Sequence, residues 1–186
     1  FLEKYHHQAS SKLKIGSLKL FADGTLSGKT AALFEPYKNT NVRGMLHYTD
    51  EQLKKHMETA YSLNKQVAIH AIGDRAIDQV LRTIETLQRE YPDYNLRPRI
   101  EHTTVSNENL RKRMKEVNAI PVIQPTLIYT AGDTYQLEKA RLDHVFATKS
   151  FIAHHLKPAA SSDSPVTDCS PFLGISSLMT RETVNG

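Results

Sequence analysis

The sequence predicts an α/β fold in which helices cover a sheet of parallel strands. Short β-branched or apolar runs alternate with segments whose apolar residues recur at helical spacing, and this alternation occurs five times in 186 residues. The composition is that of a globular chain, because hydrophobic residues make up 39% and charge is dispersed among them. Strands that alternate with helices pair in parallel through right-handed crossovers, and the helices pack on the sheet.

A strand, a long loop and a helix open the predicted order of elements. SLKLF at residues 17–21 reads as the strand, and a glycine- and proline-punctuated segment follows it to residue 48. This segment has the length of a functional loop. Thr49, followed three residues later by Gln52, forms a capping-box pattern that predicts the start of a helix. The apolar face of that helix consists of Leu53, Met57 and Ala60.

Four further strands and their helices account for most of the remaining chain. The predicted strands are QVAIHAI, RPRIEHT, AIPVIQPT and KPAASSD. The predicted helices are a stripe from Ala76 to Leu87, residues 106–118 capped by Ser106, FATKSFIAHHL, and a last one beginning at PFLGISSLMTR. Residues 127–145 form a looser segment between two of these units.

The charge and cysteine content exclude several classes of protein. The formal net charge is +4, but the densest basic cluster, RKRMK at 111–115, has the spacing of a solvated helix face. No apolar run approaches the roughly 18 residues of a membrane span. Cys169 is the only cysteine, so no internal disulfide forms. We therefore expect a cytoplasmic protein without a nucleic-acid or membrane partner.

Chemistry-bearing side chains follow the predicted strands. In parallel α/β folds ligands gather at the carboxyl ends of the strands, and His70, His102 and Asp163 each end a different one. A lone histidine beside an apolar run is more often a hydrogen-bonded core residue. Two neutral imidazoles and a carboxylate from separate strands are, however, the donors that a catalytic zinc or similar metal uses while leaving a position for water.

The sequence resembles the amidohydrolase superfamily, and within it the YtcJ-like branch of metal-dependent hydrolases, amidohydrolase family 3. The resemblance is carried by LKLFADGTLSGKTAAL, VAIHAIGDRAIDQVL, RPRIEHT, and SSDSPV followed by PFLGI and TRE. These motifs occur in family order over nearly the whole chain. The resemblance implies a (β/α)8 barrel beside a small β-sandwich, and hydrolysis of amide-type C–N bonds in small molecules by metal-activated water.

The resemblance also implies roles for individual residues. His70 and His102 correspond to metal-site histidines at the ends of barrel strands 5 and 6, and Asp163 to the catalytic, metal-binding aspartate after strand 8. Lys19, on strand 4, corresponds to the lysine that some members carboxylate to bridge two metals. An ordinary lysine paired with Asp23 is the alternative. Arg75 and Asp23 are candidate substrate contacts, although Arg75 also suits a structural pair with Asp74.

The chain departs from the family pattern because it has no His-x-His. The adjacent pairs His6-His7 and His154-His155 read as surface or helix residues. We therefore expect residues 1–186 to be the C-terminal portion of the barrel domain, a partial TIM barrel of parallel strands 4 to 8 without strands 1 to 3 or the β-sandwich. We expect this chain alone to be inactive and to self-associate through exposed sheet edges.

Two alternatives to a metal-dependent amidohydrolase remain open from the sequence. One is a degenerate, non-catalytic amidohydrolase-like domain, which an upstream His-x-His would argue against. The other is a flavodoxin-like binding module, which would need a phosphate-cradling loop after its first strand. ADGTLSG lacks the close helix start that such a loop requires. The enzyme reading implies one or two divalent ions, with zinc favoured by the ligand types.

Overall fold

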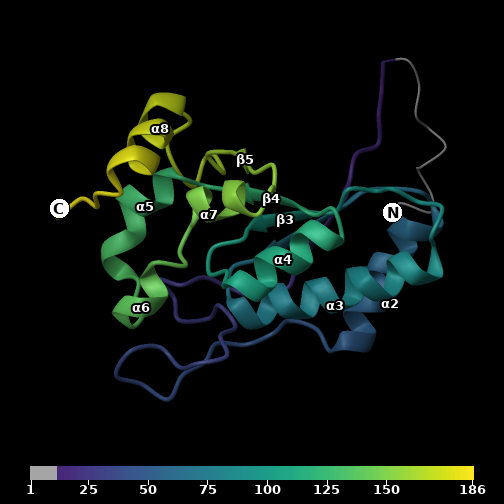
Figure 1. Cartoon of the computed structure of the whole chain (residues 1–186), viewed down its shortest axis with the longest axis horizontal. Helices are drawn as coiled ribbons and strands as arrows, with labels where there is room; N and C mark the ends of the chain where they lie inside the picture. The colour runs from purple at the N-terminus through teal and green to yellow at the C-terminus, as the bar shows by residue number, and fades with distance from the viewer. Residues whose placement is uncertain (1–11) are drawn as a thin grey trace.

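A five-stranded parallel sheet runs through the computed structural model, which describes residues 12–186 (Figure 1). The strands are β1 (Leu18–Phe21), β2 (Val67–Ala71), β3 (Arg99–His102), β4 (Ile120–Ile123) and β5 (Ala159–Ala160). They lie side by side in sequence order, and every pair of neighbours is parallel. The predicted α/β architecture is therefore confirmed. His6-His7 lies outside the described residues.

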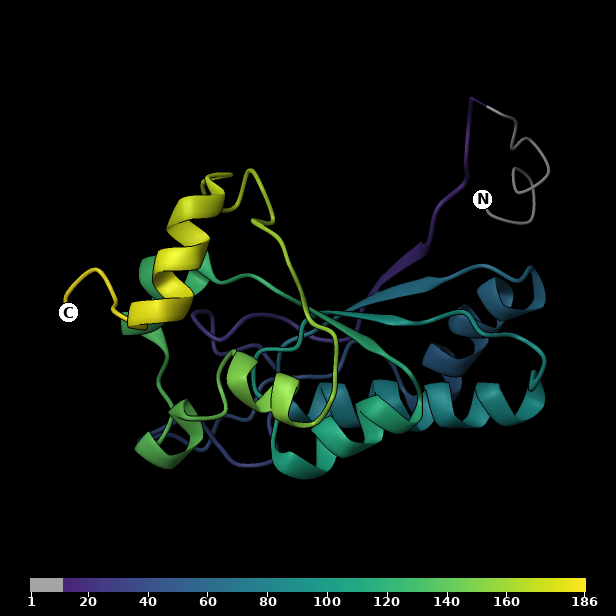
Figure 2. The ribbon, with the colours of Figure 1, turned by 45° about the horizontal axis from the view of Figure 1, so that its top comes forward.

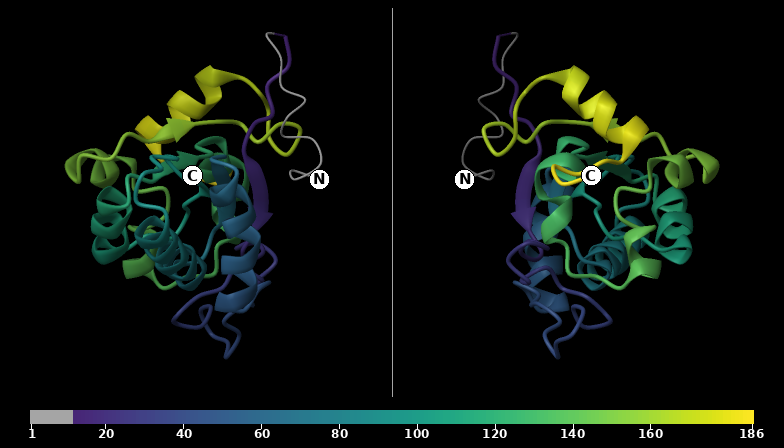
Figure 3. Two further views of the ribbon diagram at one scale, coloured as in Figure 1. Left: turned by 90° about the vertical axis from the view of Figure 1, so that its right-hand side faces the viewer. Right: turned by 90° about the vertical axis from the view of Figure 1, so that its left-hand side faces the viewer.

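Helices follow the strands and cover one side of the sheet. They are α2 (Asp50–Ser62), α3 (Asp74–Glu90), α4 (Glu108–Glu116), α5 (Thr126–Ala131), α6 (Lys139–Leu142), α7 (Thr148–Ala153) and α8 (Pro171–Thr180), with a short 3-10 helix, η2 (Gly132–Thr134). Figure 2 shows α2, α3, α4 and α7 on the same side of the strands. Viewed end-on, these helices form an arc around the sheet (Figure 3). No helix within residues 12–186 is long and apolar enough to cross a membrane.

The two faces of the sheet differ in chemistry because side chains alternate along each strand. Leu20, Ile69 and Ile100 are buried among the apolar residues of the covering helices. The register aligns His70 with Phe21 on one neighbouring strand and with Glu101 on the other, so these side chains share the opposite face. This second face carries the polar residues, and it leads to the candidate site at the carboxyl ends of the strands.

The start of α2 agrees in detail with the capping box predicted from the sequence. Thr49 Oγ1 accepts a hydrogen bond from the Gln52 N–H at 3.3 Å, and Gln52 Oε1 accepts one from the Thr49 N–H at 2.9 Å. The predicted apolar face, Leu53, Met57 and Ala60, is fully buried.

Two sequence expectations about helices were wrong. Helix α4 is capped by Asn107, whose side chain accepts from the Leu110 N–H at 3.0 Å. The Ser106 hydroxyl is buried and has no partner among the residues that the structure describes. The segment 127–145 is not loose, because it contributes to α5, η2 and α6. Helices this short have little periodicity to detect, and tertiary contacts of buried residues such as Ile128 and Leu137 stabilise them.

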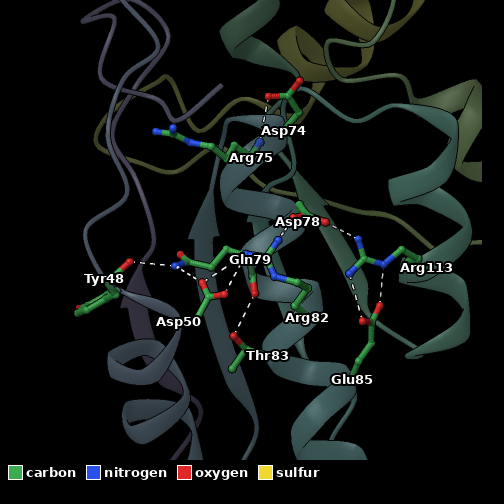
Figure 4. Close-up of polar contacts among 10 residues, drawn as sticks. All are labelled: Tyr48, Asp50, Asp74, Arg75, Asp78, Gln79, Arg82, Thr83, Glu85 and Arg113. Atoms are coloured by element: carbon green, nitrogen blue, oxygen red, sulfur yellow. Dashed lines mark hydrogen bonds and ion pairs between the residues drawn. The ribbon is translucent and has the colours of Figure 1, made fainter. Parts of the chain in front are cut away.

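Polar contacts tie α3 to the helices on both sides of it (Figure 4). Arg113 of α4 donates two hydrogen bonds to the Glu85 carboxylate, at 2.7 and 3.1 Å, and also contacts Asp78. On the other side, Gln79 donates to Asp50 of α2 at 2.9 Å. Because the loop from β2 leads directly into α3, these contacts help to fix the position of the end of β2, where His70 lies.

Candidate active site

Four predicted metal-site residues line one cavity at the carboxyl ends of the strands. The cavity has a volume of about 530 Å³, and Lys19, His70, His102 and Asp163 all contribute to its lining. They come from β1, β2, β3 and the turn after β5, segments that are far apart in the sequence. The parallel sheet brings them together because its strands all end at the same edge.

His70 is buried and held as a neutral imidazole. Its Nε2 lies 2.9 Å from the carbonyl oxygen of Gly24, and since a carbonyl only accepts, Nε2 carries the proton and donates it. The lone pair is then on Nδ1. Burial is the main cause that lowers the pKa of His70 below its usual 6.5. A neutral ring with one fixed tautomer is the form that binds a metal ion.

His102 lies against His70, with ring centroids 4.4 Å apart and ring planes at 69°. Its backbone is left-handed, with φ of 71°, and that of the next residue, Thr103, has φ of 45°. In a regular strand His102 would share the helix-facing side of its ladder partner Ala71. The left-handed backbone interrupts this alternation where the ring packs against His70. Such strained conformations cluster at functional sites.

The ring of His102 has the properties of an unused ligand. Its Nδ1 is buried and has no hydrogen-bond partner among residues 12–186. Burial, followed by the nearby His70 and Lys19, lowers the pKa of His102 to about 3, so the ring is neutral at physiological pH. An unpaired buried nitrogen costs roughly 1–3 kcal/mol. This cost is offset if the nitrogen binds a cation, so the residues present fit a metal.

Asp163 presents a free carboxylate at the exposed part of the cavity. The turn around it is held by other groups, since the main-chain carbonyl of Asp163 accepts from the Val166 N–H at 2.8 Å and Ser162 Oγ accepts from the Ser164 N–H at 3.1 Å. Within residues 12–186 no hydrogen bond involves the Asp163 carboxylate. Its φ is 56°, a second left-handed residue in the cavity lining. The carboxylate is therefore not required for the turn.

Lys19 enters the cavity from the edge strand β1. Its Nζ lies 4.8 Å from the centroid of the Phe21 ring. Partial burial of the amine lowers the pKa of Lys19, and the charges of Glu101 and Asp163 oppose this effect. A lowered pKa favours the uncharged amine, which is the form that reacts with carbon dioxide. Asp23 makes no ion pair with Lys19, so the alternative of a Lys19–Asp23 pair is wrong.

Asp23 and Arg75, the candidate substrate contacts, are not among the residues that line this cavity. The Asp23 carboxylate is 1% exposed and accepts three backbone N–H bonds, from Ala32 at 2.9 Å, Ile72 at 3.0 Å and Gly73 at 2.8 Å. Burial raises the pKa of Asp23 to about 7, and these hydrogen bonds oppose that rise. The carboxylate thus joins the loop after β1 to the end of β2.

Arg75 is engaged with the long loop rather than with the cavity. Its guanidinium donates to the carbonyl of Gly44 at 3.3 Å, and its main-chain N–H donates to Asp74 Oδ1 at 2.9 Å. Asp74 also accepts from the Phe34 N–H at 2.9 Å and lies 3.8 Å from the guanidinium of Arg141. Asp74 and Arg75 therefore have structural contacts at the start of α3, with each other, with the long loop and with Arg141 of α6.

The long loop that the sequence predicts to be functional contributes Thr25, Leu26 and Ser27 to the cavity wall, but sequence reasoning missed another part of it. Leu127, Thr130, Ala131 and Tyr135 line it from α5 and the segment after it, where no element was expected. Thr104, which follows β3, also lines it and was not singled out. The only feature of the sequence that could have indicated Thr104 as a cavity residue was its position two residues after His102.

The arrangement combines two adjacent imidazoles with a carboxylate and an amine in one cavity. Within residues 12–186, no three histidine, cysteine, aspartate or glutamate side chains are grouped closely enough to hold an ion. The structure therefore shows donors that share a cavity rather than a complete coordination sphere. These donors are suited to a divalent cation, and the free carboxylate is suited to accepting a proton.

Comparison with known proteins shows which proteins this chain is similar to. A family model described as the amidohydrolase family matches residues 1–186. The "Putative amidohydrolase YtcJ" of Bacillus subtilis (strain 168) is 34% identical over 177 residues, covering 92% of this chain and 32% of the relative. The "N-substituted formamide deformylase" of Arthrobacter pascens is 24% identical over 177 residues, covering 94% and 32%. The chain spans about a third of the length of these curated relatives.

Solved structures share the fold. Crystal structures of uncharacterized metal-dependent hydrolases from Pyrococcus furiosus and Pyrococcus horikoshii OT3 each have a TM-score of 0.82 over 95% of this chain, at 28% and 30% identity, and are themselves covered to 37% and 36%. Aspergillus niger ochratoxinase, 18% identical, has a TM-score of 0.60 over 89% of this chain and 34% of its own. The five strands are consecutive strands of a partial (β/α)8 barrel.

Proposed function

Because the chain belongs to the amidohydrolase family, we propose that it supplies metal-binding and proton-transferring residues to a hydrolase of amide-type C–N bonds in small molecules. The observation that carries this proposal is the single cavity shared by His70, His102, Asp163 and Lys19. The family match and the likeness to metal-dependent hydrolases support it. The family match and the likeness to these structures also exclude the flavodoxin-like alternative.

His70 and His102 would hold a divalent cation through neutral nitrogens, with Asp163 as a further ligand. Zinc suits imidazole and carboxylate donors. A carboxylated Lys19 would add a ligand for a second ion. When bound, the cation lowers the pKa of water toward ~7 and polarises the scissile carbonyl. We further place the protein in the cytoplasm, since its only cysteine, Cys169, is a free and exposed thiol.

Asp163 is the proton carrier in this proposal. Its carboxylate accepts a proton from the attacking water and then gives it to the leaving nitrogen, so the water adds oxygen to the acyl carbon while the C–N bond breaks. Because no hydrogen bond within residues 12–186 involves the Asp163 carboxylate, it is free to make both transfers. The buried histidines stay neutral and do not compete for the proton.

A metal-binding experiment tests this function. We expect the purified chain, stripped with chelator and titrated with zinc in a calorimeter, to bind zinc with an affinity that falls at least about tenfold in His70→Ala and in His102→Ala. His154→Ala is the matched control, because His154 lies at the end of α7 outside the cavity. Equal zinc affinity in all four proteins would contradict the proposed site.

A degenerate, non-catalytic amidohydrolase-like domain is the second candidate. It is favoured by one observation, that no three potential ligands within residues 12–186 are grouped around a common point. In that case the chain would not bind zinc through His70 or His102, and the protein at its full encoded length would not hydrolyse amides. Histidine-dependent zinc binding together with hydrolysis would exclude it.

A further inference from the structure

The orientation of the His70 ring depends on a main-chain group of the loop after β1. The Gly24 carbonyl accepts the Nε2 proton of His70 at 2.9 Å, and within residues 12–186 no hydrogen bond involves His70 Nδ1. His70 also lines the cavity. The position of Gly24 therefore determines which nitrogen of His70 is left for a ligand.

The main chain alone does not hold Gly24 in this place. The pairing of β1 with β2 continues as far as Ala22, whose N–H donates to the His70 carbonyl at 2.8 Å. The loop has its own main-chain contacts from Thr25 onward, where the carbonyl accepts from two N–H groups at 3.0 Å. Within residues 12–186, neither Asp23 nor Gly24 takes part in a hydrogen bond between main-chain groups. A different contact must fix these two residues.

The Asp23 carboxylate supplies that contact. Two of the N–H groups that donate to it belong to Ile72 and Gly73, which lie two and three residues after His70. The residue before Gly24 is thereby joined to the segment that carries His70. Asp23 Oδ1 itself lies 3.6 Å from His70 Nε2, beyond hydrogen-bond length, so the carboxylate acts on the ring through Gly24.

Close packing leaves the junction around Asp23 little room for displacement. A Cβ on Gly24 would overlap the side chain of Thr30, and a Cβ on Gly73 would overlap the main chain of Ala32. Ala32 also supplies the third N–H that donates to the Asp23 carboxylate. Three segments of the chain therefore meet around one carboxylate, and they stay in register while its hydrogen bonds are made.

We propose that Asp23 is a positioning residue of the candidate site. Its carboxylate holds the Gly24 carbonyl against His70, and this hydrogen bond keeps the ring in the orientation that leaves Nδ1 available to a ligand. Partners that orient a metal-binding histidine in this way strongly affect metal affinity. The inference rests on the proposed function only in taking a metal ion as the ligand, because the orientation of the ring itself needs no metal.

The experiment locates the proton on His70 in the metal-free chain. Long-range 1H–15N spectra of the chain with 15N-labelled histidine are recorded at a pH of about 8, where an ordinary imidazole is neutral, and His70→Gln assigns the signals. We expect the wild-type proton on Nε2. Asp23→Asn replaces an accepting oxygen with an amide nitrogen that cannot accept, so the share of His70 with its proton on Nδ1 should rise roughly two- to tenfold, the range for one lost hydrogen bond.

Asp74→Asn is the matched control, because it separates positioning from stability. The Asp74 side chain also accepts backbone N–H groups, from Phe34 of the same loop and from Arg75, but it makes no contact with His70 or Gly24. Asp74→Asn should lower the thermal midpoint and leave the proton of His70 in place. An unchanged His70 in folded Asp23→Asn, or an equal change in Asp74→Asn, overturns the inference.

A second variant displaces Gly24 without altering Asp23. Gly24→Ala forces the main chain away from Thr30 and should shift the His70 proton as Asp23→Asn does, whereas Gly16→Ala, where a Cβ meets nothing within 4 Å, should not. Circular dichroism verifies that each variant folds. If both site variants unfold, the wild-type spectrum still decides, because a proton on Nδ1 of His70 overturns the inference.

Zinc calorimetry on the same proteins connects the orientation of His70 to metal binding. Asp23→Asn should lower zinc affinity about tenfold, and Asp74→Asn should leave it unchanged. A shifted His70 proton together with unchanged zinc affinity in Asp23→Asn would support the positioning role and contradict the proposed function alone. Lower zinc affinity with an unshifted proton would overturn the positioning role, because the loss would then arise elsewhere.

Discussion

A substitution at Asp163 can distinguish a catalytic role of this residue from a structural one. Its carboxylate makes no hydrogen bond within residues 12–186, so Asp163→Asn should leave the turn intact. Asparagine has no basic oxygen to accept the water's proton. We expect kcat, measured on the protein at its full encoded length, to fall about 10²- to 10⁴-fold while the thermal midpoint changes little.

The matched control for Asp163→Asn lies in the same loop. Asp168 is exposed, is not among the cavity-lining residues, and accepts the Ser170 N–H at 2.6 Å. Asp168→Asn should therefore change stability slightly and kcat hardly at all. A near-normal rate with a lowered midpoint in Asp163→Asn would show that Asp163 is only a turn residue.

Tyr61 gives a prediction about stability and pH. Its hydroxyl is buried without a hydrogen-bond partner in the described part of the chain, and burial raises the pKa of Tyr61 to about 12 from an ordinary 10. The folded state therefore favours the neutral phenol. This contribution to stability is complete below pH 10 and is lost as the pH rises from 10 through 12.

Replacing Tyr61 with phenylalanine removes both effects. Tyr61→Phe should raise the free energy of unfolding by about 1 kcal/mol at neutral pH, because the unpaired hydroxyl is gone. The advantage over the wild type should grow on the order of 2 kcal/mol between pH 10 and 12. Urea unfolding at several pH values measures this, with Tyr129→Phe, an exposed tyrosine, as control. A destabilised Tyr61→Phe would mean that the hydroxyl has a partner in solution.

At the residue scale, strand-end position was sufficient to predict which imidazoles share the cavity. His70 follows the apolar run at residues 67–69, and His102 lies near the end of the short predicted strand RPRIEHT. The left-handed backbone of His102 was not predictable, because no glycine or asparagine marks it. The hydroxyl of Thr104, which is buried without a hydrogen-bond partner among residues 12–186, could not be predicted either, since its burial depends on which distant segments surround it.

At the scale of single helices and strands, a sequence motif predicted the structure correctly where its interacting residues are close together in the sequence. The capping box of α2 is an example, because both partners lie within one turn. Thr49→Ala removes the acceptor of the Gln52 N–H and should lower the free energy of unfolding by about 1 kcal/mol, whereas Thr49→Ser should lose little. Chemical denaturation measures the difference. An unchanged midpoint in Thr49→Ala would show that tertiary packing alone sets the start of α2.

The elements that sequence reasoning misplaced depend on tertiary structure. Ser106 and Asn107 are both good capping residues, but Ser106 is fully buried, with its N–H donating to the His144 carbonyl at 3.2 Å, and Asn107 caps the helix. Helices α5 and α6 have 6 and 4 residues, too few for a periodic pattern. Helix α5 supplies Leu127, Thr130 and Ala131 to the cavity wall, so this part of the wall was the least predictable.

At the scale of the whole molecule, the sheet has two edges without a partner strand within residues 12–186. β1 pairs only with β2, and β5 only with β4. Unpaired edges of this kind invite pairing with another chain. Helix α8 offers a competing explanation for association, because Phe172, Ile175 and Met179 are 79%, 53% and 80% exposed along it.

We expect the purified chain to self-associate through its sheet edges, and two variants separate the edges from α8. The Ser161 N–H donates to the Ile123 carbonyl at 2.9 Å, so the N–H of Ala160 points to the open edge, and Ala160→Pro removes that donor without breaking the pairing with β4. Sedimentation velocity over a range of concentrations should show less association for Ala160→Pro than for the wild type. Phe172→Lys combined with Met179→Lys should change it little. The opposite result would assign the association to the apolar face of α8, and a wild-type chain that stays monomeric would refute the expectation altogether.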